Sequence, residues 1–476
     1  MSKLIYDEVI EHFTQMETGD ITEIKDRLRS LIEESDAKLV VLDDDPTGVQ
    51  AVHDVCVYTD WTEDCFVQGF MRPERVFYIL TNSRAMTETE TLQVHREIAK
   101  NLSSAAQKLH QKYVLISRSD STLRGHFPLE TETLKESLEE IGSACFDGEI
   151  LIPYFHAGGR FTINNTHYVK DGKELIPAGE TEFARDRTFG YLSSNLCDYI
   201  EEKTQGRSSA EQVTAIGLDS LRKNDTEAIT KQLLCIEHFN KVIVNVISER
   251  DLMVFCIALL QAMKQGKNYM FRTAADFVKV FGGISSRCLL SREEMITGES
   301  KHGGIVVVGS HTAKTTCQLE SLKGMKELIF IPFQSDLVLE DKLENEVARV
   351  VKESEDYIAD GKTVVIYTNR KLLTLANDTK EQALLRSVRI SEAVCQLVGD
   401  LKVEPTFVVA KGGITSSDIG VKALRVKEAY VLGQIQPGIP VWKTDEQSKF
   451  PGIPYVIFPG NVGDVDSLRK VVETLL

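Results

Sequence analysis

Short apolar runs that break off abruptly into polar residues recur along the chain, and this pattern limits the fold more than any other sequence feature. The runs are rich in Val, Ile and Leu, and segments of helix length separate them. Such runs are typical of strands buried on both faces of a parallel sheet, where helices form the crossover connections. The sequence therefore predicts an α/β fold. The runs span residues 38–42, 76–80, 113–116, 150–152, 242–246, 305–308, 364–367 and 407–410.

The polar residues that follow these runs mark the edge of the sheet where ligands are expected. In an open α/β sheet, ligands bind beyond the carboxyl ends of the strands. Acidic, basic and hydroxyl side chains gather directly after several predicted strands, above all at residues 43–48, 81–84 and 117–122. Functional residues are therefore expected first at these positions.

A chain of 476 residues is long enough for two or three domains. Residues 291–304 are polar, contain three glycines and precede a new strand, which is typical of a linker. The sequence thus predicts two domains, residues 37–290 and 303–476, each built on a mostly parallel sheet flanked by helices. Residues 1–36 are expected to form a helical extension, in which Asp20 and Glu23 have the spacing of a capping box.

The net charge of −16 argues against a general nucleic-acid surface or an anionic-membrane surface. No apolar run approaches the length of a membrane helix, and the N-terminus lacks the apolar core of a signal peptide. We therefore expect a cytoplasmic protein. The nine cysteines form neither a C-x-x-C pair nor a cluster with histidine at zinc spacing, so we expect free, buried thiols.

Residues 43–48 place three consecutive aspartates at the end of the first predicted strand. A carboxylate at such a position can accept a proton from a substrate hydroxyl or hold a magnesium ion. The alternative is an acidic turn in which an aspartate caps the next helix. Spacing alone leaves both interpretations open, and it names no metal ligand.

Residues 117–126 combine arginine, aspartate and hydroxyl side chains in one loop. Arginine binds a carboxylate through two parallel hydrogen bonds, while aspartate and serine bind hydroxyl groups. The loop therefore favours a small polyhydroxylated anion as ligand, and a merely solvated loop is the alternative. The side chains concerned are Arg118, Ser119, Asp120, Ser121, Thr122 and Arg124.

Two histidines and an acidic turn further along the chain are weaker candidates. His156 and His167 lie on either side of a glycine pair followed by Arg160. Either histidine could act in catalysis, but lone histidines are more often structural. Residues 182–186 combine acidic and basic side chains and could equally form a surface turn.

Glycine-rich turns dominate the predicted C-terminal domain. Residues 309–316 follow a strand, but they lack the second glycine and the lysine spacing of a Walker A motif. Residues 411–418 and 458–464 add two more glycine-rich turns, whose backbone N–H groups can meet phosphate. Each signal is weak alone, and together they predict a nucleotide site.

Taken in order, these motifs resemble those of the four-carbon acid sugar kinase family. The similarity rests on residues 44–48, 120–125, 159–160, 167–169, 309–310 and 412–415, and it extends from about residue 38 to residue 464. It implies an N-terminal sugar-acid domain and a C-terminal nucleotide domain. It also implies transfer of a phosphoryl group from ATP, with Mg²⁺, to the terminal hydroxyl of threonate, erythronate or 3-oxo-tetronate.

The resemblance also implies roles for individual residues. Asp45 is our choice for the group that accepts the hydroxyl proton, with Asp44 or Asp120 as alternatives. Arg124 or Arg118 would clamp the substrate carboxylate or neutralise charge on the transferring phosphoryl group. The substrate would be held by Asp44, Arg84, Arg118, Ser119, Asp120, Ser121 and Thr122, and ATP by Ser310, Gly412, Gly413, Ile414, Thr415 and Gly460.

Three departures from the family pattern bear on the substrate more than on the reaction. Pro46 stands where many members have phenylalanine, Arg118 stands where they often have lysine, and about 35 residues precede the first strand. The expected partners are the sugar acid and ATP, and the chain could form a homodimer.

Two other classes of protein remain as alternatives. A nicotinamide-dependent hydroxy-acid oxidoreductase would share the α/β fold, but G-x-G-x-x-G is missing after the first predicted strand. A non-catalytic sugar-acid-binding protein would not need the paired glycine turns of the C-terminal domain.

Overall fold

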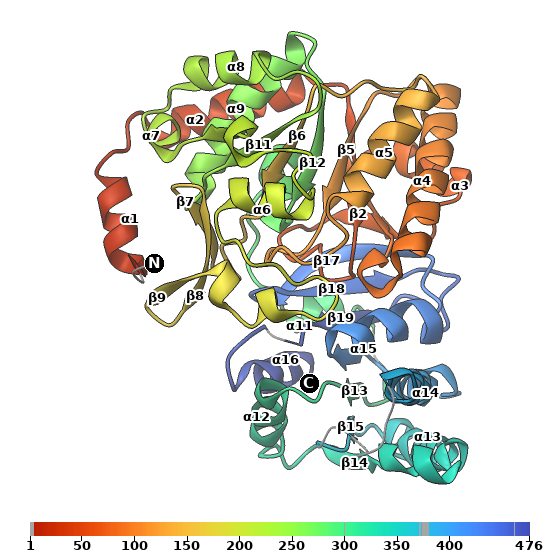
Figure 1. Ribbon diagram of the computed structural model, residues 1–476. Coiled ribbons are helices and arrows are strands. Elements are labelled where there is room, and N and C mark those ends of the chain that lie inside the picture. The colour runs from red at the N-terminus through yellow and green to blue at the C-terminus, as the bar shows by residue number, and fades with distance from the viewer. Residues whose placement is uncertain (1–3, 299, 371–372, 374–379, 461) are drawn as a thin grey trace. The chain divides into compact units, whose positions relative to one another are not determined.

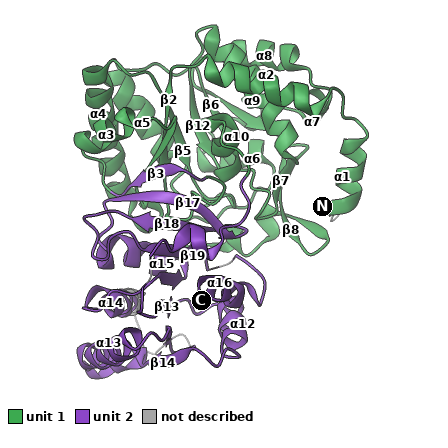
Figure 2. Cartoon of the chain, turned by 180° about the vertical axis from the view of Figure 1, so that it is seen from behind, with its two compact units in different colours: residues 1–52, 60–286 green, residues 53–59, 287–476 purple. Residues whose placement is uncertain are grey.

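The structure is a computed structural model that describes residues 4–298, 300–370, 373, 380–460 and 462–476. The chain divides into two compact units (Figure 2). Unit 1 comprises residues 1–52 and 60–286, and unit 2 comprises residues 53–59 and 287–476. A short segment from the first part of the sequence therefore belongs to unit 2.

Unit 1 is built on a parallel sheet with the strand order β10-β11-β6-β12-β5-β2-β4. Its central strands β2, β4 and β6 are mostly apolar, and their residues are buried apart from the half-buried Lys38, as expected for a sheet that is covered on both faces. The strands are β2 (Lys38–Asp43), β4 (Val76–Leu80), β5 (Tyr113–Arg118), β6 (Gly148–Ile152), β10 (Thr214–Ile216), β11 (Asn240–Val244) and β12 (Tyr269–Thr273).

Helices cover the two faces of this sheet (Figure 1). One group packs together on one face and comprises α3 (Glu63–Met71), α4 (Glu88–Leu109) and α5 (Leu129–Glu140). The other group packs around α9 (Glu249–Lys264), whose middle turns are buried, and comprises α2 (Ile21–Glu33), α7 (Leu218–Arg222), α8 (Thr226–Leu234) and α10 (Ala275–Gly282). The expected helix is α2, which begins directly after Asp20. The Asp20 side chain accepts hydrogen bonds from the N–H groups of Thr22 and Glu23, which is the Asp20 half of the predicted capping box.

A small antiparallel sheet and the N-terminal segment complete unit 1. The sheet has the order β1-β9-β8-β7, with β1 (Leu4–Ile5), β7 (Arg160–Ile163), β8 (Thr166–Asp171) and β9 (Glu174–Pro177). Helix α1 (Tyr6–Thr14) follows β1, and Glu17 then forms an ion pair with the buried Arg222. The N-terminal segment thus packs on its own chain, through a strand that the sequence did not indicate.

Unit 2 is built on a mixed sheet with the order β3-β17-β18-β19-β16-β13-β15-β14. The strands from β19 to β14 pair in parallel, and β3, β17 and β18 are antiparallel. Their bounds are β3 (Val55–Tyr58), β13 (Ile305–Val308), β14 (Ile329–Phe333), β15 (Val364–Thr368), β16 (Val408–Lys411), β17 (Glu428–Gln436), β18 (Ile439–Thr444) and β19 (Pro454–Phe458).

The helices of unit 2 also form two groups. Helices α12 (Ala313–Leu322) and α16 (Ser467–Leu475) pack together over an apolar core that includes Leu319, Val409 and Val471. Helices α13 (Leu343–Ala359), α14 (Lys380–Gly399) and α15 (Gly413–Asp418) form the other group. The remaining elements are short: α6 (Leu196–Lys203), α11 (Arg292–Met295), η1 (Ser83–Ala85), η2 (Ala178–Glu180), η3 (Phe183–Arg185), η4 (Ala210–Gln212), η5 (Ser335–Glu340) and η6 (Ile419–Ala423).

The α/β fold and the predicted strands are confirmed. Each apolar run named from the sequence lies in a strand, although β11 ends at Val244 and β16 begins only at Val408. The polar segment 291–304, which the sequence suggested as a linker, lies within unit 2. It contains α11, whose Met295 is buried. Among the residues that the structure describes, no helix is both long and apolar enough to cross a membrane.

The prediction of buried cysteines is wrong for part of the set. The cysteines are free thiols, and Cys56, Cys256 and Cys395 are buried. Others lie on surface segments, where a small side chain needs no apolar neighbours. The exposed cysteines are Cys145, Cys235, Cys288 and Cys317.

Candidate active site

The central strands of unit 1 bring the acidic turn and an arginine together at their carboxyl ends. Asp43 ends β2 and Arg118 ends the neighbouring β5, and the two residues are paired in register. The turn after β2 then folds back tightly, because Gly48 lies directly against the Asp43 carboxylate. A Cβ at position 48 would come within 1.9 Å of Asp43 Oδ2, so this turn requires glycine.

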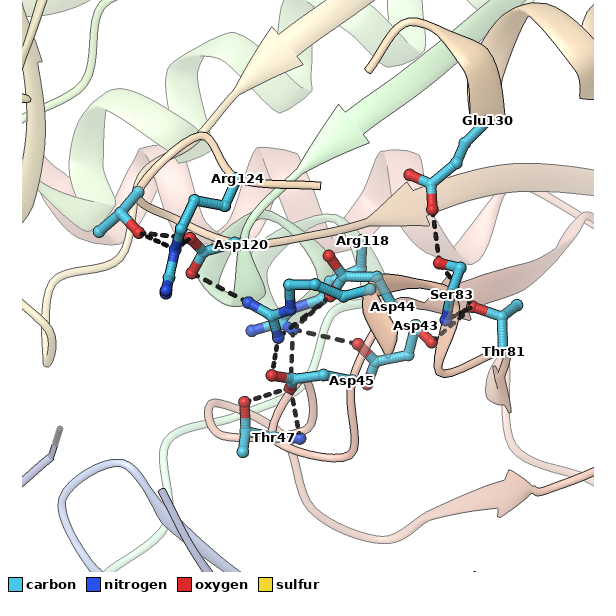
Figure 3. Close-up of polar contacts among 12 residues, drawn as sticks. Asp43, Asp44, Asp45, Thr47, Thr81, Ser83, Arg118, Asp120, Arg124 and Glu130 are labelled. Carbon is cyan, nitrogen blue, oxygen red and sulfur yellow. Dashed lines mark hydrogen bonds and ion pairs between the residues drawn. The ribbon is translucent and has the colours of Figure 1, made fainter. Parts of the chain in front are cut away.

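Arg118 is the centre of a buried ion-pair cluster (Figure 3). Its Nη1 atom lies 3.1 Å from Asp43 Oδ1, 3.6 Å from Asp44 Oδ1 and 3.7 Å from Asp45 Oδ1. The side chains of Asp43 and Asp44 are almost fully buried, while 20% of the Asp45 side chain is exposed. Asp45 is therefore the aspartate of this turn that a ligand can reach.

Arg84 joins the acidic turn to the loop after β5. It forms an ion pair with Asp45, and its guanidinium lies 3.5 Å from Asp44 Oδ1 and 3.3 Å from Asp120 Oδ1. The backbone fixes this position, since Asn82 adopts a left-handed conformation at the end of β4 and the Arg84 N–H donates to the Asp44 carbonyl oxygen. Arg84 thus lies between the two carboxylates that remain partly exposed.

The loop after β5 carries a second arginine. Arg124 Nε donates to Asp120 Oδ2 at 2.7 Å, and the Thr122 hydroxyl donates to the same oxygen. The guanidinium carbon of Arg124 lies 5.1 Å from the ring centroid of Phe183, and that of Arg160 lies 5.6 Å from it. Two arginines from separate segments therefore stack on one aromatic ring beside Asp120.

A buried pair behind this loop was not indicated by the sequence. Glu130 on α5 accepts a hydrogen bond from Ser83 and lies 3.1 Å from Arg272 Nη1. Arg272 Nη2 in turn donates to the carbonyl oxygen of Arg124 at 3.2 Å. The pair holds the Arg124 loop in place. Glu130 lies in the first turn of α5 and Arg272 lies in β12, and neither belongs to one of the polar motifs, so local sequence patterns did not find them.

Burial and ion pairing move the carboxyl pKa values in opposite directions. Burial raises the pKa of Asp43 to about 7, although Arg118 opposes this change. Burial also raises the pKa of Asp44, against the influence of Arg84 and Arg118. For Asp120, the nearby Arg124 and Arg84 outweigh burial and hold the pKa well below its usual range. Asp120 is therefore a charged acceptor, suited to bind hydroxyl groups.

The sequence-predicted residues of this site come together, but they differ in accessibility. Arg84, Arg124, Asp45 and Asp120 are partly exposed, whereas only 4% of the Arg118 side chain is exposed. Asp44 and the hydroxyl residues Ser119, Ser121 and Thr122 are also buried.

The two candidate histidines have different surroundings. His167 is fully buried, and its ring contacts the Thr162 hydroxyl and the Ser121 carbonyl oxygen. Burial lowers its pKa to about 4, so the ring is neutral and supports the loop. The His156 side chain is largely exposed, and its backbone N–H donates to Asp276.

The acidic turn offers the oxygen donors that Mg²⁺ prefers, but arginines already contact it. One carboxylate oxygen each of Asp43, Asp44 and Asp45 lies within 4.8 Å of the others. Arg118 contacts all three residues, and Arg84 contacts two of them. These guanidinium groups occupy the place of a cation, so the turn does not fit a resident magnesium ion.

In unit 2, the glycine-rich turns after β13, β16 and β19 lie against one another. Gly412 has φ +132°, and a Cβ there would lie 3.1 Å from Ser310 Cβ. A Cβ on Gly309 would lie 2.2 Å from Thr415 Oγ1, and one on Gly460 would lie 3.8 Å from Ser310 Oγ. The structure thus brings together four of the residues that the resemblance assigned to ATP: Ser310, Gly412, Thr415 and Gly460.

Hydroxyl groups connect these turns. Thr315 Oγ1 donates to Ser310 Oγ at 3.2 Å, and it lies 3.5 Å from the Gly460 carbonyl oxygen. Space remains open at Gly413, where a Cβ would meet no atom within 4 Å. The side chain of Ile414, which the sequence also assigned to this site, lies outside the described residues.

Two basic residues at these turns were not singled out from the sequence. Arg370 Nη1 donates to the Ser310 carbonyl oxygen at 2.6 Å, and Nη2 donates to the Val308 carbonyl oxygen at 3.2 Å. Lys411 Nζ donates to the Pro459 carbonyl oxygen at 2.6 Å. Both were visible in the sequence as polar residues at strand ends, but a basic residue at a strand end is common.

Family models match two successive parts of the chain. Residues 39–281 match the model of a sugar-binding N-terminal domain, and residues 305–468 match that of a nucleotide-binding C-terminal domain. The chain is therefore a two-domain α/β protein with a sugar-binding unit followed by a nucleotide-binding unit. It belongs to the four-carbon acid sugar kinase family.

Solved structures of low sequence identity share the fold. A Haemophilus influenzae protein of the DUF1537 family is 15% identical, with a TM-score of 0.58, over 92% of this chain and 100% of that chain. A Salmonella typhimurium LT2 protein described as a candidate tRNA synthase is 14% identical, with a TM-score of 0.64, over 91% of this chain and 98% of that chain. A comparison with curated protein sequences finds no match.

Proposed function

We propose that the protein transfers a phosphoryl group from ATP to the terminal (C4) hydroxyl of a four-carbon sugar acid such as threonate, erythronate or 3-oxo-tetronate. The observation that carries this proposal is the pairing of partly exposed arginines and aspartates in the sugar-binding unit: Arg84 and Arg124 beside Asp45 and Asp120. Arginine is suited to a carboxylate and aspartate to hydroxyl groups, and a sugar acid carries both.

In this proposal, Arg124 clamps the substrate carboxylate. Its partner Asp120 and the ring of Phe183 hold the guanidinium plane in one orientation. A fixed plane allows two parallel hydrogen bonds to a carboxylate with little further loss of side-chain entropy. Asp120, which stays ionised, would accept hydrogen bonds from substrate hydroxyls.

Asp45 is the proposed acceptor of the proton from the reacting hydroxyl. It is the most exposed aspartate of the acidic turn, and Arg84 lies against one of its oxygens. The other oxygen accepts from the Thr47 N–H at 2.8 Å, which fixes the carboxylate plane. Arg118 and the aspartates Asp43 and Asp44 are buried. They would position the Asp45 carboxylate from the protein interior rather than contact the substrate.

The ATP donor would bind at the glycine-rich turns of unit 2. The support is the nucleotide-binding domain match and the contact of Ser310, Gly412, Thr415 and Gly460. Mg²⁺ would arrive with the phosphates of ATP, because the acidic turn of unit 1 already has its cations. Positioning and charge stabilisation dominate phosphoryl transfer, which fits a site of arginines and backbone N–H groups.

Incubation with each tetronate and either ATP or NAD tests the proposal. Release of ADP that depends on one tetronate would support the kinase. Reduction of NAD would support a hydroxy-acid oxidoreductase instead. Binding of a tetronate without turnover of either nucleotide would make the chain a non-catalytic binding protein.

Arg124→Lys is expected to raise the KM for the sugar acid by roughly tenfold or more, with little change in the KM for ATP. An ammonium group keeps the charge but loses the two-pronged geometry and the stacking on Phe183. Steady-state kinetics with each substrate varied in turn measures the effect. Arg207→Lys, at an exposed position in unit 1, is the matched control. Unchanged constants in the Arg124 variant would remove Arg124 from the site.

Gly412→Val is expected to weaken ATP binding by roughly tenfold or more and to leave sugar-acid binding intact. A β-branched residue is strained at φ +132°, by about 1–3 kcal/mol, and its side chain would press on Ser310. Calorimetric titration with each ligand measures the two affinities. Gly217→Val is the control, because position 217 has open space and φ −84°. Normal ATP affinity in the Gly412 variant would contradict the assignment.

A further inference from the structure

Lys411 is a buried basic residue at the centre of the nucleotide-binding turns. It ends β16, and its exposed fraction is 0%. Its Nζ atom donates to the carbonyl oxygens of Pro459 at 2.6 Å and Gly460 at 3.4 Å, and lies 4.0 Å from the ring centroid of Phe458. The side chain is therefore fixed by the end of β19 and the turn that follows it.

The backbone of the same residue connects the other two turns. The N–H groups of Gly309 and Ser310 lie 3.2 Å and 3.4 Å from the Lys411 carbonyl oxygen, to which both donate. The following N–H, of Gly412, donates to the Phe458 carbonyl oxygen at 2.9 Å. Lys411 thus holds the turns after β13, β16 and β19 in contact, through its main chain and its side chain together.

The charge of this lysine has no anionic partner within the part of the chain that the structure describes. No carboxylate forms an ion pair with it, and the charged group that acts on it is Lys314 on α12, of the same sign. Burial, and secondly Lys314, lowers the pKa of Lys411 to about 7. Carbonyl oxygens satisfy the hydrogen bonds of an ammonium group without neutralising it.

We propose that Lys411 is a positioning residue of the nucleotide site, which fixes the three turns around the phosphates and supplies a positive charge that the phosphates neutralise. The inference rests on the proposed function, since it takes ATP as the ligand of these turns. The glycines require only that a ligand can approach the backbone closely. The inference adds that the ligand must be an anion, which stabilises the ammonium form of Lys411. Binding of ATP should therefore be coupled to uptake of a proton by Lys411.

Calorimetric titration of the full chain with magnesium and ATP, without sugar acid, tests the positioning role. Lys411→Met keeps the length of the side chain and removes its charge and donors. We expect the Kd for ATP to rise roughly 10- to 100-fold, as for loss of charged hydrogen bonds. Lys352→Met, at an exposed position on α13, should leave the Kd unchanged. Equal affinity in Lys411→Met and the parent would overturn the inference, whereas a parent protein that binds no ATP would refute the proposed function.

The proton uptake gives a second measurement, which can be made on the parent protein alone if Lys411→Met does not fold. The pKa of Lys411 is lowered to about 7 in the free protein, so at about pH 8 most of the amine is neutral. Phosphate groups, with a second pKa of about 6, are already ionised at this pH. Titrations in buffers with different ionisation enthalpies should show uptake approaching one proton by the parent protein. Lys411→Met should lose this uptake, while a purely structural lysine would show none in the parent. An observed heat independent of buffer in the parent protein would overturn the inference.

Discussion

Asp45→Asn is expected to lower the turnover number by about 10²–10⁴-fold, which is the range typical for loss of a general base. Both ligands should still bind to the variant. Asparagine is nearly isosteric and keeps an oxygen that can accept from the Thr47 N–H, so the turn should keep its shape. It cannot accept the proton of the substrate hydroxyl. ADP release under saturating substrates measures turnover, and calorimetry measures binding of each ligand.

Other variants in the same assay separate the alternative roles of the aspartates. If Asp45 instead holds substrate hydroxyls, Asp45→Asn should weaken sugar-acid binding and lower turnover less. If it only caps the turn, the variant should lose about 1 kcal/mol of stability and keep its kinetics. Asp120→Asn should mainly weaken binding of the sugar acid. Asp171→Asn, at an exposed position on β8, should change neither ligand binding nor turnover. Full turnover in the Asp45 variant would contradict the mechanism.

The parallel sheets were predictable from the sequence because their strands are short, apolar and buried on both faces. Residues 76–80 and 305–308 match β4 and β13 without error. The antiparallel part of unit 2 was not predictable in the same way. In β17, buried and partly exposed residues alternate, and its pairing with β3 joins residues more than 350 positions apart. Local patterns carry no information about such a partner.

The candidate site was predictable where its residues follow strands and form dense motifs. Asp45, Asp120 and Arg124 come together as expected, because the carboxyl ends of neighbouring parallel strands share one edge. The depth of each residue was not predictable. Arg118 is the last residue of β5 and Asp45 lies in the turn after β2, yet 4% of the Arg118 side chain is exposed against 20% of the Asp45 side chain. Both are polar residues near strand ends, and that pattern does not say which of them is buried.

Arg118→Met is expected to lower the free energy of unfolding by about 3–5 kcal/mol at about pH 8.5, because it leaves the buried Asp43 carboxylate without its cation and the buried Asp44 with Arg84 alone. Urea denaturation measures the loss. Arg207→Met is the matched control, since its ion pair with Glu132 is exposed and should contribute less than about 1 kcal/mol. A loss in Arg118→Met as small as in the control would contradict the buried-cluster interpretation.

The same variant should show a defined dependence on pH. Burial raises the pKa of Asp43 from its ordinary value of 3.8 to about 7, so the folded protein binds this proton more tightly than the unfolded chain. The contribution of Asp43 to stability is therefore full below about pH 4 and is lost as the pH rises through about 7. Arg118 opposes the rise, so its removal should push the pKa of Asp43 higher still. The loss of stability in Arg118→Met should then be smaller at about pH 6, where Asp43 keeps its proton, than at about pH 8.5. A loss that is equal at both values would mean that Asp43 is not the carboxyl that Arg118 stabilises.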